Sequence, residues 1–323
     1  MMRRRSIVLS AALGPLASPG IFAQNDKPLR ILVGFAAGSG IDVSARYLGE
    51  RLSQVLKQPV IVENRPGAGG QVAAAALKAA QDDGQTLLYT PMVVPVLAPM
   101  VFSKLPYDPE KDLLPVGHVC NFYFGLAVRN DFPAQNLKEM LAWLKNNPQQ
   151  AAFGSPAIGG LPHFFGLLIG REAGLSDFLH VPLYNTSVTL PTAVMGGQVP
   201  LGIDVTNEWV QLARGGKVRI LATSGPQRSK VVPDVPTFVE QGFPGIVGGG
   251  WFAMYASSKT TPANQQRINE ALNQVLAQPD VSAKLISLGY EPGGGSVNDL
   301  AQLAKADSRR WAPVVQASGV RVN

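Results

Sequence analysis

The sequence predicts an α/β protein whose two α/β lobes are joined by two crossing strands, with a cleft between them. Three patterns support this fold class. Short apolar strands alternate with amphipathic helices through most of the chain. Each half contains a strand, a glycine-rich turn and a helix in succession, and three helices close the chain without strands of their own.

The first strand–turn–helix unit covers residues 29–56. An apolar strand at 29–33 leads into the glycine-rich turn 34–40, and apolar residues then recur every three or four positions along a helix to residue 56. Small residues in such a turn let backbone N–H groups approach a ligand at the positive end of the helix. The unit is predicted to hold an anion, although many α/β domains open in this way and bind nothing there.

The elements that follow complete the two lobes. Strands at 59–62 and 86–90 flank a helix at 71–80, which predicts a parallel, helix-covered sheet. A second strand–turn–helix unit follows, with a strand at 151–153, a glycine-rich turn at 154–160 and an apolar helix at 161–173. The other elements of this half are expected as strands at 179–181, 201–204 and 218–223 and as helices at 136–145, 187–195 and 208–214.

The chain is expected to cross between the lobes twice, near 122–128 and 247–256. The closing helices at 262–277, 281–288 and 297–317 have no sheet of their own, so we expect them to return to the first lobe. The predicted first lobe is therefore discontinuous, with residues 24–124 and 248–323. The second lobe is predicted at 125–247.

Residues 1–23 have the pattern of a signal peptide. A basic start at 3–5 precedes an apolar stretch at 7–16 that is too short to span a bilayer, and Ala23 ends the predicted cleavage site. Arg4 and Arg5 also fit a twin-arginine start, which leaves the export route open. The mature protein is predicted to be periplasmic.

The composition excludes several classes of protein. Three of the 28 basic residues lie in this leader, so the rest has only a mild excess over its 22 acids and no clustered surface for nucleic acid. Cys120 is the only cysteine, which excludes an intramolecular disulfide and a Cys-rich metal site. No two histidines have metal-ligand spacing, and His163 is expected to cap or pack at the start of its helix. We expect no metal, cofactor or catalytic residue.

Several runs resemble the Bug proteins, the periplasmic solute receptors of tripartite tricarboxylate transporters. The resemblance covers the mature chain and rests above all on QPVIVENRPGAGG at 58–70, with VGFAAG at 33–38, LPYDP at 105–109 and GGQV at 196–199. It implies a type II periplasmic-binding-protein fold in which two hinged lobes close on a small carboxylate. It also implies a monomer that delivers its ligand to integral membrane transporter subunits or to a sensor protein.

The resemblance further implies that the two glycine-rich turns face each other and hold the carboxylate through backbone N–H groups. Carried over by position, the first-lobe contacts are Phe35, Gly38, Ser39, Gly40, Asp42 and Thr90. The second-lobe contacts are Ser155, Gly159, Gly160, Tyr184 and Asp204. Asp42 has an alternative role, because an acid in the first turn of a helix is favoured there without any ligand.

Two departures from the family pattern concern the ligand. The run VPLYNTS at 181–187 lacks the basic residue and the glycine that usually follow the second-lobe strand. Thr90 is followed by Pro91, Met92 and Val93 rather than by small polar residues. Both changes make the site less polar, so we expect a carboxylate with an apolar or aromatic body.

An exported NAD(P)-dependent oxidoreductase is the main alternative. Glu63 ends the second strand, as in a dinucleotide site, and the first strand is followed by Gly34, Gly38 and Gly40. A hydrolase would need a triad of Ser155, His163 and Asp204. That triad is disfavoured, because Ser155 does not lie in the Gly-x-Ser-x-Gly turn that exposes a nucleophilic serine.

Overall fold

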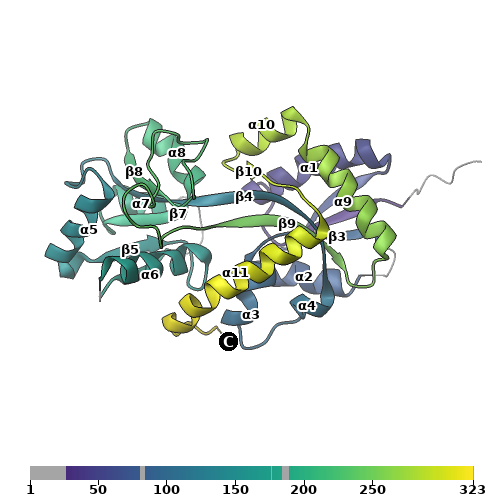
Figure 1. The fold of residues 1–323 in the computed structure, drawn as a ribbon, viewed down its shortest axis with the longest axis horizontal. Coiled ribbons are helices and arrows are strands. Elements are labelled where there is room, and N and C mark those ends of the chain that lie inside the picture. Colours follow the sequence, from purple (N-terminus) through teal and green to yellow (C-terminus); the bar gives the residue numbers. More distant parts are fainter. Residues whose placement is uncertain (1–26, 81–83, 176, 184–188, 323) are drawn as a thin grey trace, which may run out of the picture.

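Strand β4 (Leu113–Arg129) runs through both lobes of the protein. The structure is a computed structural model that describes residues 27–80, 84–175, 177–183 and 189–322. The first eleven residues of β4 lie beside the antiparallel strand β9 (Gly249–Ser257). Its last residues instead pair with two strands of the second lobe. Strands β4 and β9 are the two crossing strands in the centre of Figure 1. The two-lobed α/β fold predicted from the sequence is thereby confirmed.

The first lobe is built on a mixed sheet. Strands β2, β1 and β3 are parallel, and β3 pairs antiparallel with β9, which continues to β4. Every residue of β3 is buried, because helices cover both faces of this sheet. The strands and helices of this part of the chain are β1 (Leu29–Val33), α1 (Gly40–Leu56), β2 (Val60–Asn64), α2 (Gln71–Lys78) and β3 (Thr86–Pro91).

The second lobe continues the same sheet in the order β4, β7, β5 and β6, with β8 on β4 as well. Strands β5, β6 and β7 are parallel to one another, while β7 and β8 are antiparallel to β4. The elements are α5 (Leu137–Asn146), β5 (Ala152–Ser155), α6 (Leu161–Ala173), β6 (Leu179–Pro182), α7 (Thr189–Met195), β7 (Leu201–Val205), α8 (Thr206–Arg214) and β8 (Val218–Thr223).

The closing helices return to the first lobe. Helix α9 (Pro262–Leu276) packs on α1 and β4, and α10 (Pro279–Ser287) packs on α9. Helix α11 (Val297–Ser318) packs on β4 and also contacts α6 of the second lobe, as its diagonal course in Figure 1 shows. The exact lobe boundaries stay a prediction.

Several short elements follow residue 91 that the sequence analysis did not predict. A π-helical turn at Val93–Leu97 continues into α3 (Ala98–Val101), and α4 (Pro109–Asp112) occupies the turn-rich connector. Local chemistry accounts for α4, since Asp108 accepts hydrogen bonds from the Glu110 and Lys111 amides and Pro109 is its first residue. A two-residue strand, β10 (Glu291–Pro292), pairs with β4.

No helix among the described residues combines the length and apolar character that a membrane span requires. The predicted signal peptide lies in residues 1–26, outside the described part of the chain.

Candidate functional site

The two glycine-rich turns begin α1 and α6 in the same way. Gly38 and Gly159 have positive φ angles of 83° and 75°, a region that favours glycine. Ser39 and Gly160 then take extended conformations at the N-cap positions, and neither helix receives a hydrogen bond from an N-cap side chain. By contrast, α5, α9 and α11 are capped by the side chains of Asn136, Thr261 and Ser296.

A side chain four residues later holds each of these turns. The Gly38 amide donates to Asp42 Oδ2 at 2.8 Å, and the Gly159 amide donates to His163 Nδ1 at 3.1 Å. These two amides are thus used within the protein. Because the first N–H groups of an α-helix have no intrahelical acceptor, the amides that begin α1 and α6 are the donors available to an anion. Pro162, the second residue of α6, has no N–H and contributes no donor.

Asp42 supports the first turn through every contact it makes. Its carboxylate is buried and also accepts hydrogen bonds from Arg46 Nε at 3.1 Å and Asn64 Nδ2 at 2.8 Å. Burial alone raises the pKa of Asp42, but hydrogen bonds from Arg46, Gly38 and Asn64 together lower it. Asn64 also donates to the Phe35 carbonyl at 3.1 Å, which joins the end of β2 to the turn.

Tyr290 is a residue of this site that the sequence analysis missed. Its hydroxyl lies so close to Gly40 that a β-carbon on Gly40 would overlap it. Tyr290 follows α10, far from Gly40 in the sequence, so no local pattern points to it. The ring is buried against Phe122 and Phe252 of the crossing strands, and burial raises the pKa of its hydroxyl.

The second turn is joined to a pair of stacked histidines. The buried Ser155 Oγ lies 2.7 Å from His180 Nε2, and the His180 ring stacks on His163 with centroids 3.8 Å apart. Burial lowers the pKa of both rings, and that of His180 falls to about 4 with a further contribution from His163. As expected, His163 packs at the start of its helix, where its ring is buried and its Nδ1 accepts a hydrogen bond from the Gly159 amide, one residue before the N-cap. The partner of Ser155 is His180, so the structure does not form the triad that a hydrolase would need.

Asp204 lies at the end of β7, opposite Gly125 of β4. Its Oδ1 accepts a hydrogen bond from the Val205 amide at 2.8 Å. Burial raises the pKa of this carboxyl to about 7, and the negative charge of Glu208 adds to the increase. Thr90 is buried at the end of β3. Tyr184 lies outside the described residues.

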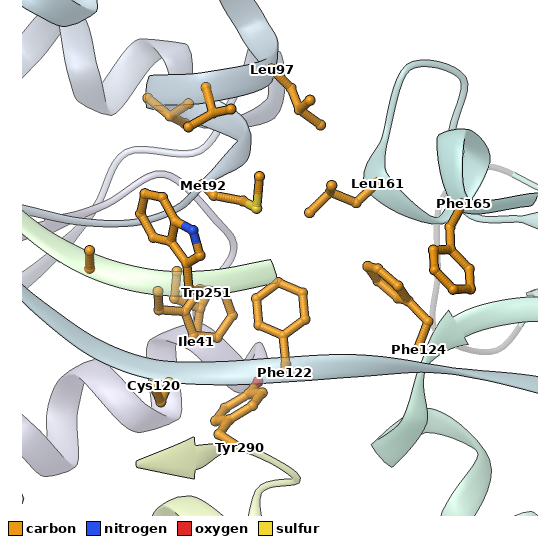
Figure 2. Close-up of a cluster of buried hydrophobic side chains, with 14 of the residues drawn as sticks. Ile41, Met92, Leu97, Cys120, Phe122, Phe124, Leu161, Phe165, Trp251 and Tyr290 are labelled. Carbon is orange, nitrogen blue, oxygen red and sulfur yellow. The ribbon is translucent and has the colours of Figure 1, made fainter. Parts of the chain in front are cut away.

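Apolar side chains from both lobes meet between the two turns (Figure 2). One buried cluster contains Met92 and Leu97 of the first lobe, Phe122, Phe124 and Trp251 of the crossing strands, and Leu161 and Phe165 of the second lobe. The cluster also includes Ile41 in the first turn of α1, and its member Leu161 is the first residue of α6. The two uncapped helix starts therefore adjoin the same apolar region.

Comparison with known proteins identifies the class to which the fold and site belong. Residues 44–320 match the tripartite tricarboxylate transporter family receptor, TctC. The chain belongs to this family. The receptor class predicted from the sequence is confirmed, and TctC proteins are solute-binding receptors that work with a transporter.

Individual relatives agree with this assignment. A UPF0065 protein of Bordetella bronchiseptica is 33% identical over 98% of this chain and 94% of its own. MatC from Rhodopseudomonas palustris, solved with bound malate, is 31% identical with a TM-score of 0.75, covering 89% of this chain and 98% of that one. The periplasmic binding protein BugD is 29% identical with a TM-score of 0.77, covering 91% and 98%.

The oxidoreductase alternative is not supported. The TctC match over residues 44–320 and the UPF0065 relative over 98% of the chain identify a solute receptor rather than a dinucleotide-binding enzyme. The structure adds a chemical reason. Glu63, the acid that would bind ribose hydroxyls, already accepts hydrogen bonds from Arg30 at 2.6 and 2.8 Å, so its carboxylate is engaged within the sheet.

Proposed function

We propose that this TctC receptor captures a small carboxylate with an apolar or aromatic body between its lobes. The observation that carries the proposal is that α1 and α6 both begin without a side-chain cap beside one apolar cluster. Helix N-termini attract anions, whereas the cluster offers no charged group to the rest of the ligand. The malate bound to MatC, a relative of similar fold, also supports a carboxylate.

The contacts in the proposed site have different roles. Gly38, Asp42 and Gly159 shape the turns, because their hydrogen-bonding groups are used internally. The residues proposed to face the ligand are Phe35, Ser39, Gly40, Thr90, Ser155, Gly160 and Asp204, with Tyr290 added from the structure. Among these, the hydroxyls of Ser39 and Ser155 are already hydrogen-bonded to Ala36 and His180, so we propose that they shape the site rather than bind the ligand. Asp204 suits a hydroxyl, amide or ammonium group when ionised, and a second carboxylate when protonated.

Delivery completes the proposed function. The chain is exported, cleaved near Ala23 and acts in the periplasm as a monomer without a cofactor or catalytic activity. The closed complex then docks on integral membrane transporter subunits, or on a sensor protein where no transporter is paired with it. A ligand can favour this closed form only through its higher affinity for it.

Thermal unfolding of residues 24–323 tests the proposal. We expect stabilisation by one group among mono-, di- and tricarboxylates, aromatic acids and amino acids, and none by NAD or NADP. A ligand at a hundred times its dissociation constant adds about 2.7 kcal/mol to the free energy of unfolding. A shift with the dinucleotides alone would contradict the proposal.

A substitution at Gly40 tests whether the carboxylate binds at the first turn. Gly40→Val should abolish the carboxylate-induced shift, because the new side chain overlaps the Tyr290 hydroxyl at the start of α1. The matched control is Gly215→Val after α8, where φ is −79° and the nearest atom would lie 3.3 Å from a β-carbon. Full affinity in Gly40→Val would remove the first turn from the site.

A further inference from the structure

The turn before α6 depends on an imidazole, whereas the turn before α1 depends on a carboxylate. In both, the amide of a positive-φ glycine donates to a side chain four residues later. Asp42 can accept this bond as long as it is ionised. His163 can accept it only while Nδ1 carries a lone pair, which a protonated imidazole lacks. The two turns therefore respond differently to acid.

His180 holds the accepting imidazole in place. Its ring lies parallel to His163 within 19°, and its Nε2 is 2.7 Å from Ser155 Oγ at the end of β5. Phe153 of the same strand packs against the His180 ring at 4.9 Å. The hydrogen bond between Ser155 and His180 and the ring stacking thus connect β5 and β6 to His163, the acceptor of the Gly159 amide.

No acid among the described residues contributes to the pKa of either stacked ring. Burial lowers the pKa of His163, and burial together with the neighbouring His163 lowers that of His180. Phe153 of β5 and His180 of β6 stack on His163. The other elements packed on α6 include β7 with Asp204 and α11 with Asp307, and neither acid contributes to the pKa of His163 or His180. Arg171 and Glu172 of the same helix are two turns away and pair with each other. Both rings are therefore neutral near pH 7, and two charged rings at 3.8 Å would repel each other.

We propose that His163 and His180 are positioning residues of the second turn, and that protonation of His163 releases the Gly159 amide and disorders the start of α6. Its functional consequence, weaker binding of the carboxylate at acid pH, rests on the proposed function. The first turn retains its acceptor under the same conditions, because hydrogen bonds to Asp42 keep that carboxylate ionised. Acid thus acts on one lobe of the receptor.

Amide exchange tests the turn without any ligand. The sequence contains two Ile-Gly pairs, Ile158-Gly159 and Ile169-Gly170, so labelling isoleucine carbonyls and glycine nitrogens selects two amide signals. We expect the Gly159 amide to be protected at pH 7 and to lose roughly three- to tenfold in protection by pH 4.5. Gly170, buried inside α6, serves as the internal reference.

Substitutions separate positioning from a general loss of structure. His163→Gln, whose amide oxygen can accept the bond but does not titrate, should keep Gly159 protected at both pH values. His163→Ala should lose that protection already at pH 7. His118→Gln is the matched control, because His118 bonds Asn121 on β4 and does not contact the turn. Equal protection in the wild type and His163→Ala, or an equal loss in acid for His163→Gln, would overturn the inference.

Calorimetry with malate and benzoate adds the functional consequence. Affinity for the carboxylate that binds should fall between pH 7 and pH 4.5 by roughly three- to tenfold more in the wild type than in His163→Gln. Protonation of the ligand carboxylate weakens binding equally in both proteins, so comparing their changes in affinity cancels this contribution. Binding of neither probe at pH 7 would count against the proposed function, while the exchange data would still decide the role of His163.

Discussion

Asp204 combines a position at the end of a parallel strand with an unusual acidity. Its pKa of about 7 lies above the ordinary value of 3.8 because the carboxyl is buried. The folded chain therefore loses stability as the pH rises from about 4 through 7, where the unfolded chain ionises more readily. Below pH 4 both states are protonated and the loss disappears. We expect Asp204→Asn to raise the melting temperature of the free protein at pH 8 and to change it little at pH 4, as measured by differential scanning calorimetry.

The exposed acid Glu110 of α4 provides the control for this measurement. Glu110→Gln should leave the pH dependence of the melting temperature unchanged. A melting temperature of Asp204→Asn that follows the wild type at both pH values would show that Asp204 ionises normally in the folded protein. Its proposed choice between hydroxyl-bearing and carboxylate-bearing ligands would then lose its chemical basis.

Individual site residues differ in how far the sequence predicts them. Gly38 and Gly159 are visible as glycines between a strand and a helix, and both adopt the positive φ that such turns need. The sequence does not predict the hydrogen bonds made by their amides, because these depend on whether the Asp42 and His163 side chains point back to the turn. Tyr290 is invisible from the sequence for a different reason, since only tertiary folding brings it to Gly40.

Helix α6 shows how a small residue positions an element. Gly166 faces β5, and a β-carbon there would overlap the Phe153 ring. Alanine improves helix propensity by about 1 kcal/mol, but overpacking costs about 1–3 kcal/mol. We expect Gly166→Ala to lower the urea midpoint. Gly49→Ala in α1 is the control, because the nearest atom to its β-carbon would be a Val60 methyl group at 3.3 Å. An unchanged midpoint in Gly166→Ala would mean that Phe153 moves aside freely.

The long elements follow from apolar periodicity, whereas the short ones require tertiary contacts. The bounds of α6 match the prediction at both ends, and Asn136 caps α5 as its position suggests. The first crossing was predicted near 122–128, yet strand β4 already begins at Leu113 and continues through Cys120 and Asn121, because β9 pairs with it from Leu113 to Tyr123. The apolar run at Val93–Leu97 gave no helix signal, since Pro95 interrupts it and its side chains are buried by the surrounding fold.

The two lobes share one large hydrophobic cluster in this conformation, and a smaller cluster around Trp209 lies within the second lobe. Buried residues of the first lobe, the crossing strands and the second lobe form one contiguous cluster. Helix α11 strengthens this connection, since Asp307 accepts a hydrogen bond from the buried Trp251 Nε1 at 2.7 Å on a crossing strand, while other residues of the helix contact α6. Opening of the lobes must therefore expose apolar surface, and an apolar ligand body would replace part of the lost contact.

Gly250 on β9 permits the close approach of the two lobes. A β-carbon at this position would overlap the Phe122 ring and lie 3.0 Å from a Leu161 methyl group of the second lobe. Gly250→Ala should push Leu161 away, increase the radius of gyration of the free protein in small-angle scattering and reduce the carboxylate-induced thermal shift. Gly215→Ala, far from this contact, should change neither quantity. If Gly250→Ala keeps the wild-type radius and shift, Phe122 absorbs the added methyl group by rotating, and the closeness of the lobes does not depend on this glycine.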